Sequence, residues 1–92
     1  MSVTIDNITF SHSHYDADGD VLYLKTVVPD NAVEFDSTAE GHALRYDAAG
    51  QLVGITLVSA RHSLKQNGKV EITLPRHIDV DVAALDSVLV TL

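Results

Sequence analysis

The feature that most constrains this chain is an alternation of apolar and polar residues with a period of two, interrupted by short turn-like segments. Successive side chains of a β-strand point to opposite faces of the sheet, so this alternation is typical of strands with one buried face. The positions expected to line a common interior are Leu44 and Tyr46, then Val53, Ile55 and Leu57, then Val70, Ile72 and Leu74. The sequence therefore predicts a mainly β fold, on the border of α+β, built as a small antiparallel sheet of consecutive hairpins.

Two acidic segments that contain glycine are expected to form hairpin turns. They are Asp16-Ala-Asp-Gly-Asp20 and Asp47-Ala-Ala-Gly50. Aspartate and glycine both favour turns, and we expect positive φ at Gly19 and Gly50 because glycine adopts it without strain. Gly54 lies inside a predicted strand instead, where a missing side chain indicates a bulge or the close approach of another segment.

The first turn segment also raises the question of a calcium site. A helix-loop-helix calcium loop needs glycine at position 6 and glutamate at position 12. Counted from Asp16, the glycine stands at position 4 and position 12 is Val27, and both flanks have the pattern of strands. We therefore interpret the segment as a turn.

The remaining segments complete the predicted secondary structure. We expect a strand at 8–15 with Ile8, Phe10, His12 and His14 on one face, an edge strand at 32–35, a loop at 36–41, one helical turn within 61–68 and an extra strand at 69–74. In the C-terminal segment 78–92, apolar spacings of three and four favour a short C-terminal helix with Asp79 or Asp81 as its N-cap. Residues 88–92 could instead pair as a strand.

Several of these residues together resemble a known family. These residues are Tyr15-Asp16, the strand from Asp20 to Leu24, Tyr46-Asp47-x-x-Gly50, and Val53-Gly54-Ile55 followed by Ser59-Ala60. In order and spacing they are similar to the small bacterial domain of unknown function called DUF2283. Arg45 and Thr56 replace residues that are often acidic in that pattern. The resemblance implies a compact antiparallel β-domain, no established enzymatic activity, and an association with small toxin-like proteins. We expect a single domain over 1–92, with a family-like core at about 15–61.

The charge of the chain bears on its partners and its compartment. Thirteen acidic residues outnumber six lysines and arginines, which are spread along the chain, so the net charge is −7. Nucleic-acid binding needs clustered cations, so we expect no nucleic-acid partner and regard a basic protein as the better match. The chain has no cysteine and no pattern of a signal peptide or a membrane span. We therefore expect a cytoplasmic protein that does not bind membranes.

The candidate metal ligands are His12 and His14. Two residues apart in a strand, they point the same way, and zinc accepts three histidines and a water. His42 is the third candidate, with His62 and His77 as alternatives. The same pattern also describes a polar, partly exposed strand face, so we predict neither a metal nor a cofactor.

No nucleophile, base and orienting group can be assembled from the sequence, and we predict no catalytic residues and no enzyme activity. An open sheet leaves unpaired edges that invite another strand. The leading hypothesis is a non-enzymatic protein-interaction module, a homodimer, that acts through an edge strand or through residues 78–92. It would be the antitoxin-like partner of a small basic protein. The alternative is a small-ligand or metal-binding protein that uses the His12/His14 strand face.

Overall fold

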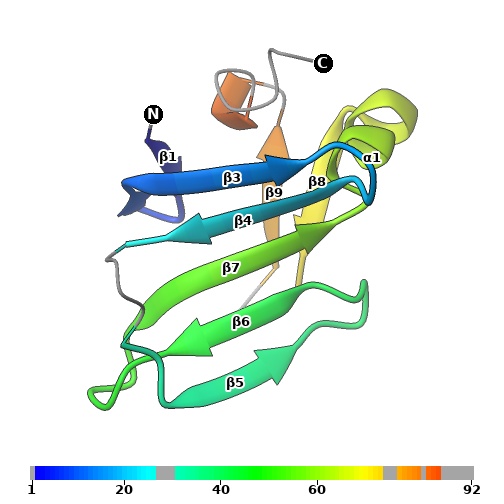
Figure 1. Ribbon diagram of the computed structural model, residues 1–92. Helices are drawn as coiled ribbons and strands as arrows, with labels where there is room; N and C mark the ends of the chain where they lie inside the picture. Colours follow the sequence, from blue (N-terminus) through cyan, green and yellow to red (C-terminus); the bar gives the residue numbers. More distant parts are fainter. Residues whose placement is uncertain (1, 27–30, 74–76, 82, 86–92) are drawn as a thin grey trace.

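The computed structural model describes residues 2–26, 31–73, 77–81 and 83–85 (Figure 1). The described residues form nine strands and one α-helix. In chain order these are β1 (Val3–Ile5), β2 (Ile8–Phe10), β3 (His12–Asp16), β4 (Val21–Lys25), β5 (Glu34–Ser37), β6 (Ala43–Tyr46), β7 (Leu52–Val58), α1 (Ala60–Asn67), β8 (Lys69–Ile72) and β9 (Ile78–Asp81). The fold is mainly β, as the sequence predicts.

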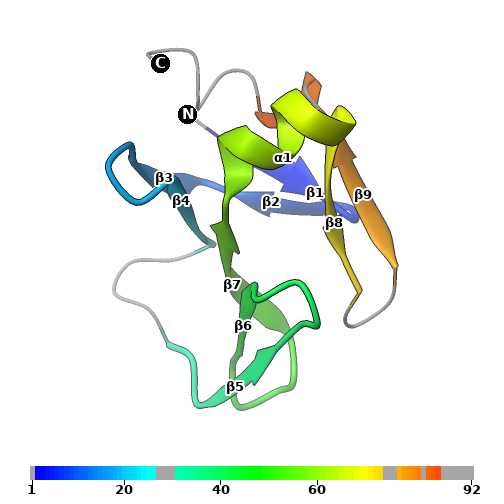
Figure 2. The same cartoon turned by 90° about the vertical axis from the view of Figure 1, so that its right-hand side faces the viewer.

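A five-stranded antiparallel sheet with the order β3-β4-β7-β6-β5 forms the centre of the molecule. The consecutive hairpins β3–β4, β5–β6 and β6–β7 confirm the predicted architecture. Because β4 pairs with β7 and not with β5, β7 becomes the central strand. The β1–β2 and β8–β9 hairpins lie on one side of the sheet, with α1 at one end (Figures 1 and 2). No described element covers the other side.

The hydrophobic core lies between the five-stranded sheet and the two small hairpins. Alternate residues of the sheet are buried in it, namely Leu22, Leu24, Leu44, Ile55 and Leu57, and they meet Phe10, Val70 and Ile72 from the covering hairpins. Val53 is also buried and Tyr46 packs against the cluster, whereas Leu74 lies outside the described residues. Burying one such side chain stabilises the fold by about 1.5–3 kcal/mol. The buried face that the alternation predicts therefore accounts for the packing of the sheet against the two hairpins.

The predicted continuous strand at 8–15 is wrong, because the chain forms two strands there. β2 pairs with β1 across a two-residue turn in which Asp6 and Asn7 both have positive φ, and β3 begins only after Ser11. A strand that is interrupted can place the following residues on the other face. Phe10 is accordingly buried, while His12 and His14 are exposed on the uncovered side.

The turn geometry agrees with the prediction at Gly50 and differs at Gly19. Gly50 has a φ of 79°, but in the first turn the left-handed residue is Asp20, with a φ of 55°. This loop has four residues between the paired Asp16 and Val21, and its last position takes the left-handed conformation. Aspartate tolerates that conformation better than most residues, and side-chain hydrogen bonds described below hold Asp20 in place.

Gly54 shows both features expected of it. The register between β6 and β7 shifts at Arg45 and Tyr46, which marks a bulge beside this glycine. A Cβ at position 54 would lie 3.0 Å from Cδ of Arg45 and 3.4 Å from the carbonyl oxygen of Leu24. The absent side chain therefore leaves room for Arg45 to lie across β7.

The segment after β7 is more helical than predicted. It forms α1, eight residues long, in place of one turn, and Gly68 ends it with a φ of 74° and an N–H bond to the carbonyl of Leu64. The alternative with Asp79 as the N-cap is wrong, because residues 78–81 form β9 and pair with β8. Helical residues follow at 83–85, and the Asp81 carboxylate accepts a hydrogen bond from the Ala84 N–H at 3.0 Å, so Asp81 is the predicted N-cap. The possible strand at 88–92 lies outside the described residues.

The predicted edge strand is present but begins two residues later, so Asp36 and Ser37, expected in a loop, belong to β5. The extra strand at 69–74 is shorter and ends at Ile72. Among the described residues there is no helix with the length and apolar character needed to cross a membrane.

Candidate functional site

Strand register sets out three rows of side chains on the uncovered side of the five-stranded sheet, and one of them contains Asp16, Val21 and Val58. The register aligns His14, Tyr23, Thr56, Ala43 and Ser37 in the second row, and His12, Lys25, Gly54, Arg45 and Phe35 in the third. The ten positions of these last two rows are called the open face below. None of the thirteen acidic residues is among them, although the chain has a net charge of −7. The open face therefore differs in charge from the rest of the molecule.

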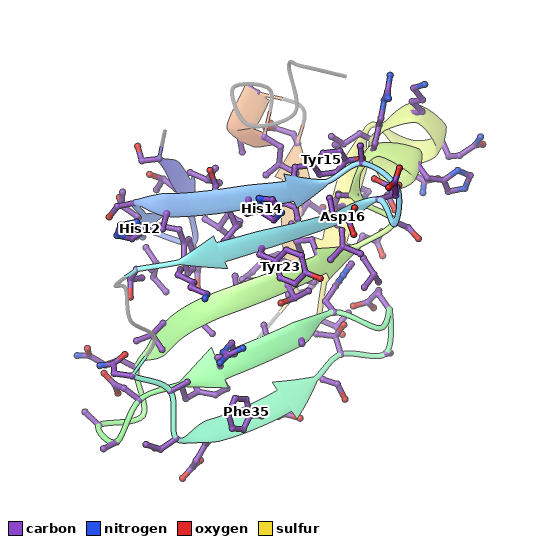
Figure 3. All side chains as sticks on the ribbon, viewed as in Figure 1. His12, His14, Tyr15, Asp16, Tyr23 and Phe35 are labelled. Carbon is purple, nitrogen blue, oxygen red and sulfur yellow. The ribbon has the colours of Figure 1, made fainter. Side chains whose placement is uncertain are left out.

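One end of the open face is hollowed. His12, Ser13, His14, Tyr23 and Lys25 line a hollow of about 460 Å³, here called the β3–β4 hollow. The rings of His14 and Tyr23 lie beside each other, 6.1 Å between centroids and 28° between planes (Figure 3). Such an offset stack presents a flat aromatic surface to solvent.

At the other end of the open face, Arg45 of β6 lies against Phe35 of β5. The guanidinium carbon is 5.2 Å from the centre of the phenyl ring, and Gly54 leaves the room that the arginine stem occupies. A cation over an aromatic face is worth about 0.5–1 kcal/mol at an exposed site. The contact orients Phe35 without burying it.

β5 is an edge strand whose four residues are all exposed. Phe35 is 67% exposed and Val33, just before the strand, is 59% exposed; among the described residues these are the two most exposed large apolar side chains. Glu34 and Asp36 point to the opposite side of the sheet from Phe35, across from residues of β6. The edge thus has an apolar side and an acidic side.

A separate cluster joins the first hairpin turn to α1. The Tyr15 hydroxyl donates a 2.6 Å hydrogen bond to Asp20, whose carboxylate also accepts the backbone N–H groups of Arg61 and His62 at 2.8 and 3.0 Å. The Asp20 carbonyl accepts the Ala60 N–H at 3.3 Å. Because Ser59 makes no side-chain cap, Asp20 satisfies the first turn of α1 from a distant part of the chain.

These contacts shift the ionisation of both side chains. Burial, the hydrogen bond to Asp20 and the charge of that carboxylate raise the pKa of Tyr15 to about 12. Burial alone would raise the pKa of Asp20, but hydrogen bonds from Tyr15, His62 and Arg61 outweigh it and hold this pKa below its ordinary value. The carboxylate is therefore charged at neutral pH, and the cluster has the character of a structural junction.

His42 is buried, with 3% of its surface exposed, on the covered side of the sheet. Its Nδ1 accepts the Val58 N–H at 3.1 Å, so at neutral pH the ring carries its proton on Nε2. Burial lowers the pKa of His42, against the opposing effects of a hydrogen bond with the Glu71 backbone and the charge of Glu40. The ring thus links β7 to β8 in its neutral form.

The structure brings two of the three candidate metal ligands together and separates the third. His12 and His14 lie on the open face, while His42 lies on the opposite face of the same sheet. Within the described ranges, the ligand atoms of one group come within 4.8 Å of one another, those of Glu71, His77 and Asp79. The Lys69 ammonium already lies 3.4 Å from both of these carboxylates, so the group has its counterion.

Reasoning from sequence did not find Lys25, Arg45 and Phe35 as neighbours of the histidine pair. They align with His12 only because β4 pairs with β7, and β7 with β6. The alternation placed the buried face of β4, β6 and β7 correctly, but no local signal gave the order of the strands.

The model of one protein family, described as a protein of unknown function and designated DUF2283, matches residues 12–61. This range covers β3 through the start of α1 and more than half of the chain. It includes both ends of the Tyr15–Asp20–α1 junction. No curated protein and no solved structure matches the chain.

Proposed function

The chain belongs to the DUF2283 family, and from its structure we propose that it is a non-enzymatic protein-interaction module that receives an extended segment of a partner on the outer edge of β5. The observation that carries the proposal is the exposure of Phe35, at 67%, on a strand whose outer edge has no partner in the described part of the chain. Such an edge offers backbone N–H and C=O groups to an added strand.

The side chains of β5 indicate the character of the partner. An added strand would point alternate side chains toward Phe35 and Val33 on one side of the sheet, and toward Glu34 and Asp36 on the other. The first set would bury exposed apolar surface, and the second would be attracted if it carried lysine or arginine. A small basic protein fits this edge, and blocking such a protein is the antitoxin-like role that we propose for the module.

The homodimer predicted from the sequence would need a different surface. If two copies paired their β5 strands antiparallel around Phe35, Glu34 of each copy would lie opposite Asp36 of the other. Like charges directly opposite each other destabilise a strand pair. Light scattering on the purified protein tests the dimer. Glu34→Lys alone would turn both like-charged pairs of a β5 dimer into opposite-charged pairs, so a dimer that this variant leaves unchanged would use another surface.

Photo-crosslinking in the cell tests the β5 proposal directly. Benzoyl-phenylalanine replaces Phe35 in one variant and Gln66, exposed on α1, in the matched control. We expect an adduct with a basic protein from position 35 and none from position 66, with mass spectrometry placing the link in an extended segment. Equal labelling from both positions, or no adduct from position 35, would contradict the proposal.

A further inference from the structure

The β3–β4 hollow lies at the opposite edge of the five-stranded sheet from β5. We propose that it binds a small planar anion, that is, an aromatic ring bearing an acidic group such as a carboxylate, a sulfonate or a phosphate. The inference rests on the shape, the ring stack and the charge of the hollow, and it stands independently of the partner proposed for β5.

The size of the hollow suits a small molecule. Its volume of about 460 Å³ falls within the range of about 300–1,000 Å³ that is usual for small-ligand sites. The lining comes from two paired strands, β3 and β4, in which His14 lies opposite Tyr23 and His12 opposite Lys25. Side chains on paired strands of a sheet are held more precisely than side chains on loops.

The ring stack provides the preference for a planar ligand. The His14 and Tyr23 rings lie 28° from parallel, and Tyr23 remains 40% exposed, so part of its ring is available for contact. A third ring placed against this pair would extend an offset stack, which is the arrangement that aromatic groups prefer. An aliphatic ligand of the same volume would gain only the burial of apolar area.

The charge provides the preference for an anion. Lys25 lines the hollow, and Arg45 lies in the same row two strands away. The nearest carboxylate along β3 is that of Asp16, which lies on the same side of the sheet two residues beyond His14. Its Oδ1 accepts the N–H groups of Asp18 and Gly19 within its own turn. An anion at the ten open-face positions therefore meets two cations and no carboxylate, which favours its binding there.

The same residues are less suited to a metal ion. Within the described ranges, His12 and His14 belong to no group of three ligands with metal-binding spacing, and the Lys25 cation lies opposite His12 in the register. A divalent cation there would have two imidazoles and a repelling ammonium. The experiment must therefore distinguish binding of zinc from binding of the anion.

The test uses two fluorescent probes that share their rings and differ in charge: 1-anilinonaphthalene-8-sulfonate and its neutral analogue N-phenyl-1-naphthylamine. Binding to the full chain is measured by fluorescence titration, and the site is mapped by amide chemical shifts. We expect the sulfonate to bind more tightly than the neutral probe and to shift the amides of 12–14 and 23–25.

Two variants and one control separate charge from stacking. Lys25→Gln should weaken binding of the sulfonate about three-fold and leave the neutral probe unchanged, since an exposed ion pair is weak. Tyr23→Leu should weaken both probes about five-fold through loss of stacking. Lys65→Gln removes an exposed cation on α1 and should change neither.

Three results would overturn the proposal. They are equal binding of the two probes with no effect of Lys25→Gln, shifts spread over the chain without a maximum at β3 and β4, and a zinc-induced thermal shift that is lost in His12→Ala. None of the substituted side chains is buried in the core, and amide spectra that keep the wild-type dispersion show that each variant is folded.

Discussion

The Tyr15 hydroxyl lies 2.6 Å from the Asp20 carboxylate, and that carboxylate receives the first N–H groups of a helix that begins forty residues later in the chain. One acidic residue thus closes the first hairpin and anchors α1. The two ends of this junction are the segment Tyr15-Asp16-x-x-x-Asp20 and the Ser59-Ala60 pair. Both resemble the family pattern.

Removing the Asp20 carboxylate should destabilise the protein. Asp20→Gly keeps the positive φ without strain, and Asn7→Gly makes the same change in backbone freedom, so the difference between the two variants reports on the Asp20 side chain. A lost helix cap and lost hydrogen bonds to a charged group predict a decrease of about 2–3 kcal/mol in the free energy of unfolding. The matched control, Asn7→Gly at another left-handed position, should stay within about 0.5 kcal/mol of wild type in urea denaturation. Equal effects of both would refute the junction.

The ionisation of Tyr15 is a second readout of the same contact. Because its pKa is raised to about 12, the folded chain holds this proton while the unfolded chain loses it near pH 10, and the free energy of unfolding falls as the pH rises through that window. Burial and the charge of Asp36 also raise the pKa of Tyr46, so a late step from that residue remains in every variant. Ultraviolet titration should show a separate step at about pH 12 that disappears in Tyr15→Phe. Asp20→Asn should move this step to lower pH, and a step at about pH 12 that persists in Tyr15→Phe would assign it to another residue.

His42 should make stability depend on pH on the acidic side of neutrality. Its pKa in the folded protein lies below the ordinary value of 6.5, so under mildly acidic conditions the unfolded chain binds a proton that the folded chain does not. The free energy of unfolding therefore falls as the pH drops below about 6.5. Protonation of Nδ1 would also remove the acceptor of the Val58 N–H.

Two variants isolate this contribution of His42. Urea denaturation at about pH 7.5 and about pH 5.5 should show a smaller loss of stability in His42→Asn than in wild type, since asparagine does not titrate there. His12→Asn, which changes an exposed ring on β3, should keep the wild-type dependence. Identical slopes in wild type and His42→Asn would show that the buried ring is not responsible.

Gly54→Ala should destabilise the sheet through Arg45. The new Cβ would lie 3.0 Å from Cδ of Arg45, and forcing a side chain aside in a packed site typically costs about 1–3 kcal/mol. The cost should be smaller when Arg45→Ala is already present, and a double-mutant cycle measures that difference. The same cost in both backgrounds would assign the effect to the atoms that remain, the Cβ of residue 45 and the Leu24 carbonyl oxygen, each 3.4 Å away.

The sequence predicted the core better than it predicted the open face. Leu44, Ile55 and Leu57 alternate with polar or small residues because only one side of their strands is covered, and that pattern can be read locally. The proximity of Lys25 to Arg45 depends on β7 lying between β4 and β6, a long-range pairing. The alternation within a single segment does not indicate this pairing of strands.

The errors at the ends of the chain have local causes. The alternation with a period of two continues through Ile8, Phe10, His12 and His14, so the sequence pattern shows no interruption at Ser11, where the strand breaks. The Asp6-Asn7 pair did indicate the turn between β1 and β2. In the same way, Ile78 and Val80 alone are too few to distinguish β9 from the first turn of a helix.

The account depends most on the outer edge of β5, and amide hydrogen exchange tests it most directly. Exchange is measured on the free protein and on its complex with the partner captured at position 35. We predict strong new protection confined to Glu34–Ser37 of β5, with α1 unchanged as the internal reference. Protection that appears elsewhere while β5 exchanges as in the free protein would contradict the claim that this edge is the binding surface.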